Sequence, residues 1–553
     1  MERWPKKVPA FLHVASFAMK HKQVFFAAFL GLAACIVLPG GVLAVSDPYT
    51  ALLERLEEDR IHLGVADVVG LALENNLGLQ VGRFDPMIQK TRISFEKGIF
   101  DPTVFGQTSF DNNQFPTSTT IAGTRVETLG VSVGLRQRIP VGGQVEFRFD
   151  NSRTLTNAPV SFLNPEYRTT TRLTLTQPLL KGFGIDVTRS RITLAEIQKE
   201  VEDLNLKQKA IQVAEQTEKA YWDLVLSYAK LDEAQESRDR ARRLLEENRS
   251  RVQLGQLPEV EVIQAEAEVA ARESNVIGAK KQIKDMDEQL KMMLNLPAGA
   301  ALWEKSVFPV DKPRLMDVDL SFLRSVQVAL EKRVEVLTNE LNLKGGYVAR
   351  KVAKNATLPS LNFQGSYSLQ GLSGNQRSGD ILGFGGLGGF QNLPQRFQGG
   401  YNQSLDVLGS ADFPEWVVGL QLEYPIGNRA AKADLAQADL RIKQSVAQQA
   451  QIQQQVATEL REIIRRVDSS KDQVDAATVS VGLSERRLAE EERKFRYGLS
   501  TSFDVLQMQE RLIAQKSQLS QSQNQYMRAL VDFDRAKGIL LDSRLAKLGN
   551  QEN

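Results

Sequence analysis

Two acidic residues, Glu261 and Asp504, occupy the same place in a phrase that the chain carries twice. The phrase reads GQLPEVEVIQ at 255–264 and GLSTSFDVLQ at 498–507, with glycine first and an acid six positions later. The chemistry open to such carboxylates is proton transfer or attraction of cations. The acids of this chain lie on predicted helices at regular surface spacing, where charge usually marks a solvated face. An enzyme is therefore the least favoured class of function.

Metal binding and nucleophilic catalysis have few candidate residues. The single cysteine, Cys35, lies with His13 and His21 in the apolar N-terminal segment. His62 is then the only histidine left in an exported chain, and we interpret it as a surface residue ahead of a helix. Disulfides, histidine–cysteine metal sites and histidine-based triads are not expected, and neither a metal nor a cofactor is predicted.

Nucleotide and nucleic-acid binding are also disfavoured. The sequence has no GxxxxGK[ST] phosphate-binding loop, so any use of ATP must belong to a partner protein. GFGGLGG at 383–389 lacks the Lys-Ser and the helix that follow such a loop, and we interpret it as a flexible extracellular loop. The net charge of +2 exerts no general pull on nucleic acid, so no nucleic-acid partner is predicted.

Residues 1–44 have the features of an export signal. Lysines at positions 6, 7, 20 and 22 precede the apolar run VFFAAFLGLAACIVL, and small residues follow it. Cleavage after Val42-Leu43-Ala44 is the favoured interpretation. LAAC at 32–35 also resembles a lipoprotein box, which leaves lipidation of Cys35 open, and a retained membrane helix is a third possibility.

Long helices make up most of the predicted structure, in two pairs of a long and a shorter member. The first pair covers 186–254, with Asp186 as a possible cap, and 258–294; the second covers 428–497 and 501–540. A helix of about 69 residues spans roughly 100 Å. Helices of globular domains are rarely that long.

A seven-residue apolar period follows both long helices and favours left-handed supercoiling of packed helices. Ala477 and Ser484 are small enough for close approach, and polar residues on the other faces argue against membrane-spanning helices. The repeating positions are Leu460, Val467, Val474, Val481, Leu488 and Phe495, and, 243 residues earlier, Thr217, Leu224, Leu231, Arg238, Leu245 and Val252.

Strand-like alternation of apolar and polar residues precedes each long helix. It occupies 129–139 and 145–149, on either side of a tight PVGG turn, and then 361–370 and 416–424. The runs have about the length of a transmembrane β-strand, and aromatic ends such as Trp416 and Tyr424 suit bilayer interfaces. A half-buried soluble sheet also alternates, but no further helices are available to cover it. The short PVGG turn and the long glycine-rich segment 371–413 favour an outer-membrane barrel.

Both halves pass from strand to helix through a proline, Pro178 in QPLLKGFGID and Pro425 in YPIGNRAA. With VADVVGLALENN at 65–76, DPTVFG at 101–106, LPSLNF at 358–363 and the repeated phrase, the chain resembles the TolC-type outer-membrane efflux protein family over about 60–545. The resemblance implies an α+β membrane protein with two structural repeats. A trimeric transmembrane β-barrel would be continued by a long periplasmic α-helical barrel.

Family members usually contribute four strands per chain. The hairpin around PVGG adds a pair here, which either joins the barrel wall or folds elsewhere. The implied segments are a signal segment (1–44), N-terminal periplasmic helices (45–100), first-repeat strands (101–178), a first helical hairpin (179–297), an equatorial linker (298–325), a second-repeat helix (326–357), second-repeat strands with a long extracellular loop (358–425), a second helical hairpin (426–541) and a tail (542–553).

The resemblance also implies roles for residues around the repeated phrase. Gly255, Pro258 and Gly498 would form the periplasmic turns of the helix pairs and contact an adaptor, and Ser500, Thr501 or Ser502 would cap the last long helix. Three copies of Asp504 would ring a closed entrance and favour cations. The other implied entrance positions are Glu261 as the first-half acid, Phe495 as a matching aromatic, Gln507 in place of a second acid and Ser500 in place of a locking arginine.

The implied function is a passive exit duct in the bacterial outer membrane, with a periplasmic extension. It would carry small molecules as a homotrimer, together with a periplasmic adaptor (membrane fusion) protein and an inner-membrane pump or ABC transporter. The duct of a type I protein secretion system uses the same architecture and stays open as an alternative. A periplasmic coiled-coil protein without a pore is a third interpretation.

Overall fold

The computed structural model describes residues 56–57, 60–118, 123–158, 161–296, 301–377 and 393–549. The chain divides into two units at Glu54, and all of the described residues belong to the second unit, Arg55–Asn553. The predicted signal segment 1–44, Cys35 with its possible lipidation, and the loop prediction for 383–389 lie outside the described residues.

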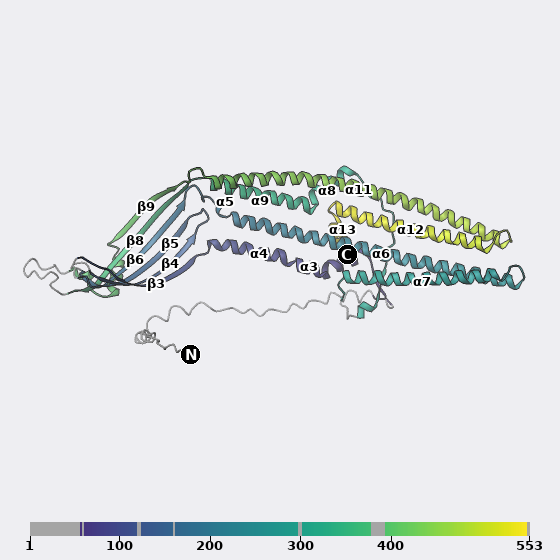
Figure 1. Ribbon diagram of the computed structural model, residues 1–553, viewed down its shortest axis with the longest axis horizontal. Coiled ribbons are helices and arrows are strands. Elements are labelled where there is room, and N and C mark those ends of the chain that lie inside the picture. The colour runs from purple at the N-terminus through teal and green to yellow at the C-terminus, as the bar shows by residue number, and fades with distance from the viewer. Residues whose placement is uncertain are drawn as a thin grey trace, which may run out of the picture. The chain divides into compact units, whose positions relative to one another are not determined.

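A six-stranded antiparallel sheet carries the strands that the alternating sequence predicts (Figure 1). The PVGG hairpin joins this sheet rather than folding elsewhere, because its two strands occupy the second and third places in the strand order. In order across the sheet, the strands are β3 (Thr103–Gln114), β4 (Arg125–Arg138), β5 (Gln144–Thr156), β6 (Leu163–Pro178), β8 (Ser360–Gln376) and β9 (Pro414–Glu423).

The two faces of this sheet differ in polarity. One row of directly paired residues crosses all six strands with large apolar side chains, each between 42% and 73% exposed: Val104, Leu135, Phe147, Leu173, Tyr367 and Trp416. The neighbouring row on the opposite face carries Arg148, Arg172, Ser368 and Glu415. Ion pairs lie on that polar face, between Arg148 and Asp150 at 2.7 Å and between Arg136 and Glu146 at 2.9 Å.

Part of 371–413, predicted as one long loop, has regular structure. Strand β8 extends to Gln376, and α10 (Tyr401–Ser410) packs on β8 and β6, where the Thr169 hydroxyl donates to the Ser404 carbonyl at 3.1 Å. The loop prediction missed this helix because its apolar residues contact the sheet surface, which local glycine content does not reveal.

The four long helices are confirmed as α6 (Ser190–Gln253), α7 (Val260–Met293), α11 (Arg429–Arg496) and α12 (Ser502–Ala536). The predicted cap at Asp186 is wrong. A separate turn, α5 (Ile185–Thr188), contains Asp186, and Arg189 is the N-cap residue of α6. Asp186 instead pairs with Lys351.

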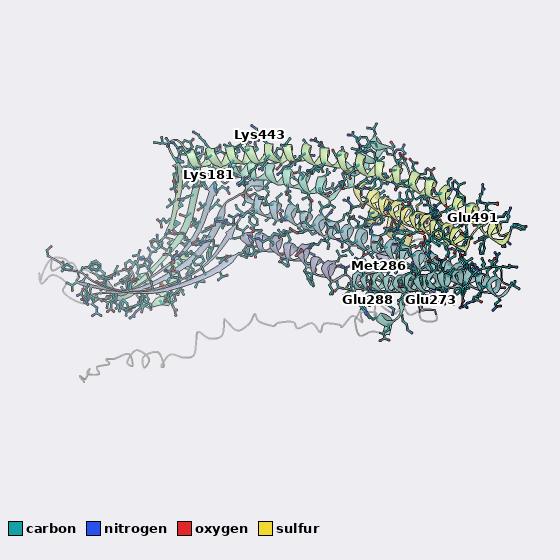
Figure 2. The ribbon with its side chains drawn as sticks, turned by 45° about the vertical axis from the view of Figure 1, so that its right-hand side comes forward. Lys181, Glu273, Met286, Glu288, Lys443 and Glu491 are labelled. Carbon is teal, nitrogen blue, oxygen red and sulfur yellow. The ribbon has the colours of Figure 1, made fainter. Side chains whose placement is uncertain are left out.

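Shorter helices complete two strips that follow one another along α6 and α11 (Figure 1). Next to the sheet, α4 (Phe84–Lys97) packs on α6, α6 on α9 (Val334–Ala356), and α9 on α11. Farther from the sheet, α7 packs on α6, α6 on α12, and α12 on α11. Figure 2 labels Lys181 at the junction of sheet and helices and Glu491 near the far end of α11.

Most of the remaining elements surround the middle of the long helices; the exceptions are η1, which contacts α4 and β4, and η3, which contacts β8 and α10. Strand β7 in the linker pairs in parallel with β2. The C-terminal segment predicted as a tail forms α13, where the buried guanidinium of Arg544 bonds the Glu218 carboxylate at 2.8 and 2.9 Å. These elements are β1 (Leu56–Glu57), β2 (Arg60–Leu63), α2 (Val65–Asn75), α3 (Leu77–Gly82), η1 (Gly98–Phe100), η2 (Ala301–Glu304), β7 (Ser306–Pro309), α8 (Phe322–Lys332), η3 (Gln395–Phe397) and α13 (Leu540–Gly549).

The predicted seven-residue period marks the packed side of the long helices. On α11, Leu460, Val467, Val474, Leu488 and Phe495 are buried. On α6, the matching Thr217, Leu224 and Leu245 are buried as well. Within the part of the chain that the structure describes, no helix contains an apolar stretch long enough to cross a bilayer.

Candidate functional site at the helix tips

The two copies of the repeated phrase form the same kind of turn. Gly255 and Gly498 both have φ of 71°, a left-handed conformation that glycine adopts without a steric penalty. Gly498 N donates to Phe495 O at 3.0 Å and Leu499 N to Lys494 O at 2.9 Å, and the first turn repeats both bonds. This pair of bonds is the Schellman arrangement, which satisfies the last carbonyls of a helix and ends it. The predicted turn roles of both glycines are confirmed.

The helix starts after the two turns differ. Thr501, one of three predicted candidates, is the N-cap of α12: its hydroxyl accepts from Asp504 N at 3.2 Å and donates to the Asp504 carboxylate at 2.6 Å. The bonds that the hydroxyl and the backbone N–H of Thr501 donate to the carboxylate lower the pKa of Asp504. Helix α7 has Glu259 as its N-cap residue, with no side-chain cap bond, after Pro258. One turn is thus closed by its own side chains and the other is not.

The side chains of the first turn instead reach the second. Glu261 accepts a hydrogen bond from the Ser502 hydroxyl. Arg251, in the last turn of α6, donates to the Phe495 carbonyl at 2.9 Å and lies 4.2 Å from the centre of the Phe495 ring. The tips of the two hairpins are therefore joined by a charged acceptor and by a charged donor.

An apolar cluster lies directly behind these bonds. Leu244 of α6 packs with Leu488 and Phe495 of α11 and with Val505 and Leu512 of α12, all of them buried. Phe495, predicted from the resemblance as an aromatic of the entrance, is the largest of these side chains and is only 2% exposed. Its ring therefore fixes the position of the α11–α12 tip.

The other predicted entrance residues have simpler surroundings. Ser500 donates to the Glu491 carboxylate at 2.6 Å, and this bond, followed by the one from Lys494, lowers the pKa of Glu491. Gln507 is exposed on α12. Pro178 and Pro425 lie at the opposite end of the long helices, where β6 and β9 end.

Polar contacts continue from the tip along the seam between α6 and α12, a set that the sequence did not reveal. They are Lys516–Glu236 at 2.8 Å, Ser520–Glu233 at 2.6 Å, Arg528–Asp223 at 2.7 Å and Lys219–Asp532 at 2.5 Å. Burial raises the pKa of Glu233 despite its bond from Ser520.

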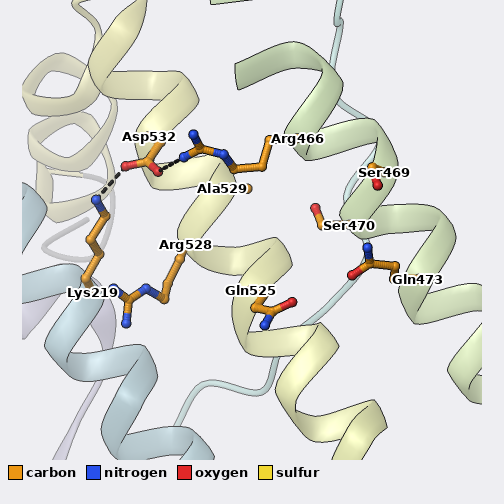
Figure 3. A pocket seen from close by; sticks show the side chains of 9 residues that line it. All are labelled: Lys219, Arg466, Ser469, Ser470, Gln473, Gln525, Arg528, Ala529 and Asp532. Atoms are coloured by element: carbon orange, nitrogen blue, oxygen red, sulfur yellow. Dashed lines mark hydrogen bonds and ion pairs between the residues drawn. The ribbon is translucent and has the colours of Figure 1, made fainter. Parts of the chain in front are cut away.

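The seam ends beside a pocket of about 350 Å³ between α11 and α12 (Figure 3). Asp532 lies there between Lys219 of α6 and Arg466 of α11, at 2.5 and 3.1 Å, so one carboxylate holds both hairpins. The two hairpins are therefore joined both by apolar packing at the tip, where Leu244 of α6 joins the cluster of α11 and α12, and by polar contacts along the seam.

His62 and the acidic side chains are the candidate metal ligands among the residues that the structure describes. These residues contain no group of three or more histidine, cysteine, aspartate or glutamate side chains placed to hold a metal. His62 lies in β2, just ahead of α2, and is partly buried, with its ring centre 5.1 Å from that of Phe308. The ring of His62 contacts Phe308 of the neighbouring strand β7, and the sequence did not predict this contact.

A known protein family matches most of this chain. The model of the family described as outer membrane efflux protein matches residues 150–296 and 325–538. Comparison with curated proteins gives no match.

Solved structures of outer-membrane channels share the fold at low sequence identity. The Campylobacter jejuni channel CmeC has a TM-score of 0.56 at 16% identity, with 86% of this chain and 86% of that chain covered. The Vibrio cholerae outer membrane protein VceC has a TM-score of 0.55 at 14% identity, with 86% of this chain and 96% of that chain covered. The open-state channel MtrE of Neisseria gonorrhoeae has a TM-score of 0.54 at 17% identity, with 87% of this chain and 93% of that chain covered.

Proposed function

Because the chain belongs to the outer membrane efflux protein family, we propose that three copies form the exit duct of a tripartite efflux system. The six-stranded sheets would close a barrel in the outer membrane, and the helices would continue it as a tunnel through the periplasm. Segments 101–178 and 358–425 would supply the barrel, and 179–297 and 426–541 the tunnel. The signal segment 1–44 would direct export.

One observation carries the proposal: the sheet has an uncovered apolar face and two open edges. The apolar row from Val104 to Trp416 crosses all six strands and is exposed on each of them. In water such a face would drive aggregation, whereas in lipid it is solvated. Open edges cannot persist in lipid, because unpaired backbone groups have no partner there, so copies of the chain would pair edge to edge.

The helix tips suit a gate in this duct. The α11–α12 hairpin supplies four of the five buried residues of the tip cluster, and it contacts α6 through Leu244 of that cluster and through polar bonds such as those of Arg251 and Asp532. An adaptor that binds the tips near 246–262 and 489–505 and favours the outward position of this hairpin would replace those bonds and shift the population to the open state. An inner-membrane pump or ABC transporter would supply the energy and the cargo.

The test of the duct combines conductance with export. We expect detergent-purified protein to form threefold particles with a continuous central channel and to conduct ions in planar bilayers. Deletion of the gene should make cells retain small toxic compounds, while a loss confined to secreted proteins would favour the type I secretion duct. A detergent-independent monomer without conductance would contradict the proposal.

Asp504 gives a test of the entrance itself. Three copies around the axis would favour cations, so Asp504→Asn should move the reversal potential in a salt gradient toward that of a non-selective pore. Asp504→Glu is the matched control, because it keeps a carboxylate at the same position and should keep the wild-type reversal potential. An unchanged reversal potential in Asp504→Asn would place the constriction elsewhere and leave the duct proposal standing.

A further inference from the structure

We infer that three copies of this chain close an eighteen-stranded barrel, with six strands from each copy; this inference rests on the proposed trimer. Strand β3 of each copy pairs with β9 of the next. The partner recognised by the two sheet edges is thus a second copy of this chain. The barrel is wider than one built from four strands per chain, and the outer-membrane part of the duct is no narrower than the helical part.

The extra hairpin is a full member of the sheet. Strand β4 pairs with β3 from Arg125 to Arg136, and β5 pairs with β6 from Gln144 to Thr154. A hairpin that folded away from the wall would leave β3 and β6 without these neighbours. Both interior pairings therefore place β4 and β5 inside the wall.

The turn of this hairpin is also fixed to the junction between sheet and helices. Gly184 N donates to the Val141 carbonyl at 3.2 Å, and the Gln177 side chain donates to the same oxygen at 3.3 Å. Gly142 has φ of 101°, and a β-carbon there would lie 2.2 Å from the Gly182 carbonyl oxygen. Such a close approach to the chain that leads into α6 holds the hairpin at the base of the sheet.

The hairpin has the same two faces as its neighbours. Leu135 and Phe147 continue the apolar row between Val104 and Leu173, and are 42% and 47% exposed. On the other face, Ser132 donates to Asp150 at 2.6 Å, and Arg136 pairs with Glu146 at 2.9 Å. One continuous apolar face and one continuous polar face are what a wall between lipid and water requires.

Closure through the edges preserves the antiparallel order. With six antiparallel strands in each copy, β3 and β9 run in opposite directions, so β9 of one copy meets β3 of the next as another antiparallel pair. Val104 and Phe110 on β3 and Leu420 on β9 are more than half exposed, so both edge strands carry apolar side chains suited to lipid.

The width of the sheet matches the width of the helical strip. Four helices at 8–10 Å spacing occupy roughly 32–40 Å. Six strands at about 4.8 Å spacing and a tilt of 35–45° occupy roughly 35–41 Å around a barrel. Four strands would occupy only about 23–27 Å. The helices α4, α6, α9 and α11 therefore meet a sheet of their own width, and no taper is needed at the junction.

The first test is the strand count in the assembled full-length protein, measured by electron cryo-microscopy in detergent. We expect a threefold particle whose barrel has eighteen strands, with β3 and β9 of adjacent copies paired. A threefold particle with twelve wall strands and the β4–β5 hairpin outside the wall would overturn this inference but leave the proposed function intact. A particle without a threefold pore would overturn both.

The second test measures the width of the barrel from outside. Removing residues 119–160 joins Ser118 to Ser161 and leaves β3 beside β6, which already run antiparallel. In planar bilayers, the protein is added to one chamber, and the helices stay on that side. Polyethylene glycols of increasing size are then added only to the opposite chamber, which the barrel faces. Since barrel diameter grows linearly with strand number, the largest polymer radius that enters should fall to about two-thirds of the wild-type value.

The control for this deletion is removal of residues 379–391, which leaves all six strands of the sheet in place. This variant should keep the wild-type polymer cut-off. Equal cut-offs for wild type and the 119–160 deletion, both as trimers, would overturn the inference. If the 119–160 deletion does not assemble, the strand count of the wild-type particle decides the question.

Discussion

Glu261 and Asp504 hold the same position in their two repeats, yet they make different contacts. Asp504 bonds within its own turn, where it completes the cap of α12 with Thr501 at 2.6 Å. Glu261 leaves its own turn uncapped and accepts from Ser502 of the other hairpin. The backbone turns that carry the two acids share one conformation and one hydrogen-bond pattern.

The positions just before the turns differ in the same direction. Arg251 of the first repeat bonds the Phe495 carbonyl across the tip, whereas the matching Lys494 pairs with Glu491 on its own helix at 3.1 Å. At the tip, the charged groups that link the hairpins, Arg251 and Glu261, belong to the first repeat, whereas Asp504 and Lys494 of the second repeat bond within their own hairpin. An α11–α12 hairpin that moves outward would keep its own cap and the packing of Phe495 on Leu488 and Val505, and it would lose the links and the contact with Leu244 of α6.

The largest expected effect comes from Phe495, at the centre of the tip cluster. Phe495→Ala leaves a cavity among Leu244, Leu488 and Val505 and should cost about 3–5 kcal/mol of local stability. The matching Val252→Ala in the first repeat should cost about 1 kcal/mol, since Val252 is only partly buried and loses less apolar area. Hydrogen exchange of the amides on both sides of each turn measures the difference. Equal losses in the two repeats would contradict the asymmetry.

The link between the hairpins is tested by Arg251. Arg251→Gln loses the charged bond to the Phe495 carbonyl and the contact with its ring, together worth about 2 kcal/mol. Lys494→Gln removes only an exposed pair and should cost less than about 1 kcal/mol. In bilayers, Arg251→Gln should raise the fraction of time that the pore spends in its high-conductance state, while Lys494→Gln should not. A similar rise in both variants would show that the charge, rather than the link, matters.

The cap of α12 gives a smaller effect. Thr501→Ala removes the oxygen that accepts from Asp504 N and should cost about 1 kcal/mol, whereas Thr501→Ser keeps that oxygen and should cost little. At the matching helix start, Glu259→Ala should stay within about 0.5 kcal/mol, because Glu259 makes no cap bond. Thermal unfolding followed by hydrogen exchange at residues 499–506 and 256–263 compares them. A loss in Glu259→Ala as large as in Thr501→Ala would remove this difference between the repeats.

The sequence predicted those features that depend on local pattern. The seven-residue period located the buried side of α11, from Leu460 to Phe495, and the glycines at 255 and 498 located both turns. Alternation located four of the six strands, namely the two of the PVGG hairpin, β8 and β9, whereas β3 and β6 were expected only from the resemblance. The place of the hairpin in the sheet depended on pairings with β3 and β6 that alternation does not encode.

The contacts between hairpins were not predictable in the same way. A period identifies which face of a helix is packed, but it does not say which helix packs there, so Arg251 looked like an ordinary charge in a last helical turn. Asp186 looked like a cap because the sequence does not separate the short α5 from α6. Arg544 anchors α13 through Glu218, a residue 326 positions away, and no local signal marks that pair.

The smallest expected effect is a pH dependence confined to the second tip. Hydrogen bonds from Thr501 lower the pKa of Asp504, and those from Ser500 and Lys494 lower the pKa of Glu491, relative to ordinary values of 3.8 and 4.5. A carboxyl whose pKa is lower in the folded state adds stability above its unfolded pKa and loses that contribution as the pH falls through the folded value.

Amide exchange around Thr501, corrected for the intrinsic pH dependence, should therefore be unchanged between pH 7 and about 5 and should quicken below about pH 4. The double variant Asp504→Asn, Glu491→Gln should abolish this acid step while leaving the packing around Phe495 intact. An acid step that persists in the double variant would assign it to other carboxylates. The second turn would then owe its stability to the apolar cluster alone, and the contrast with the first turn would reduce to the links made by Arg251 and Glu261.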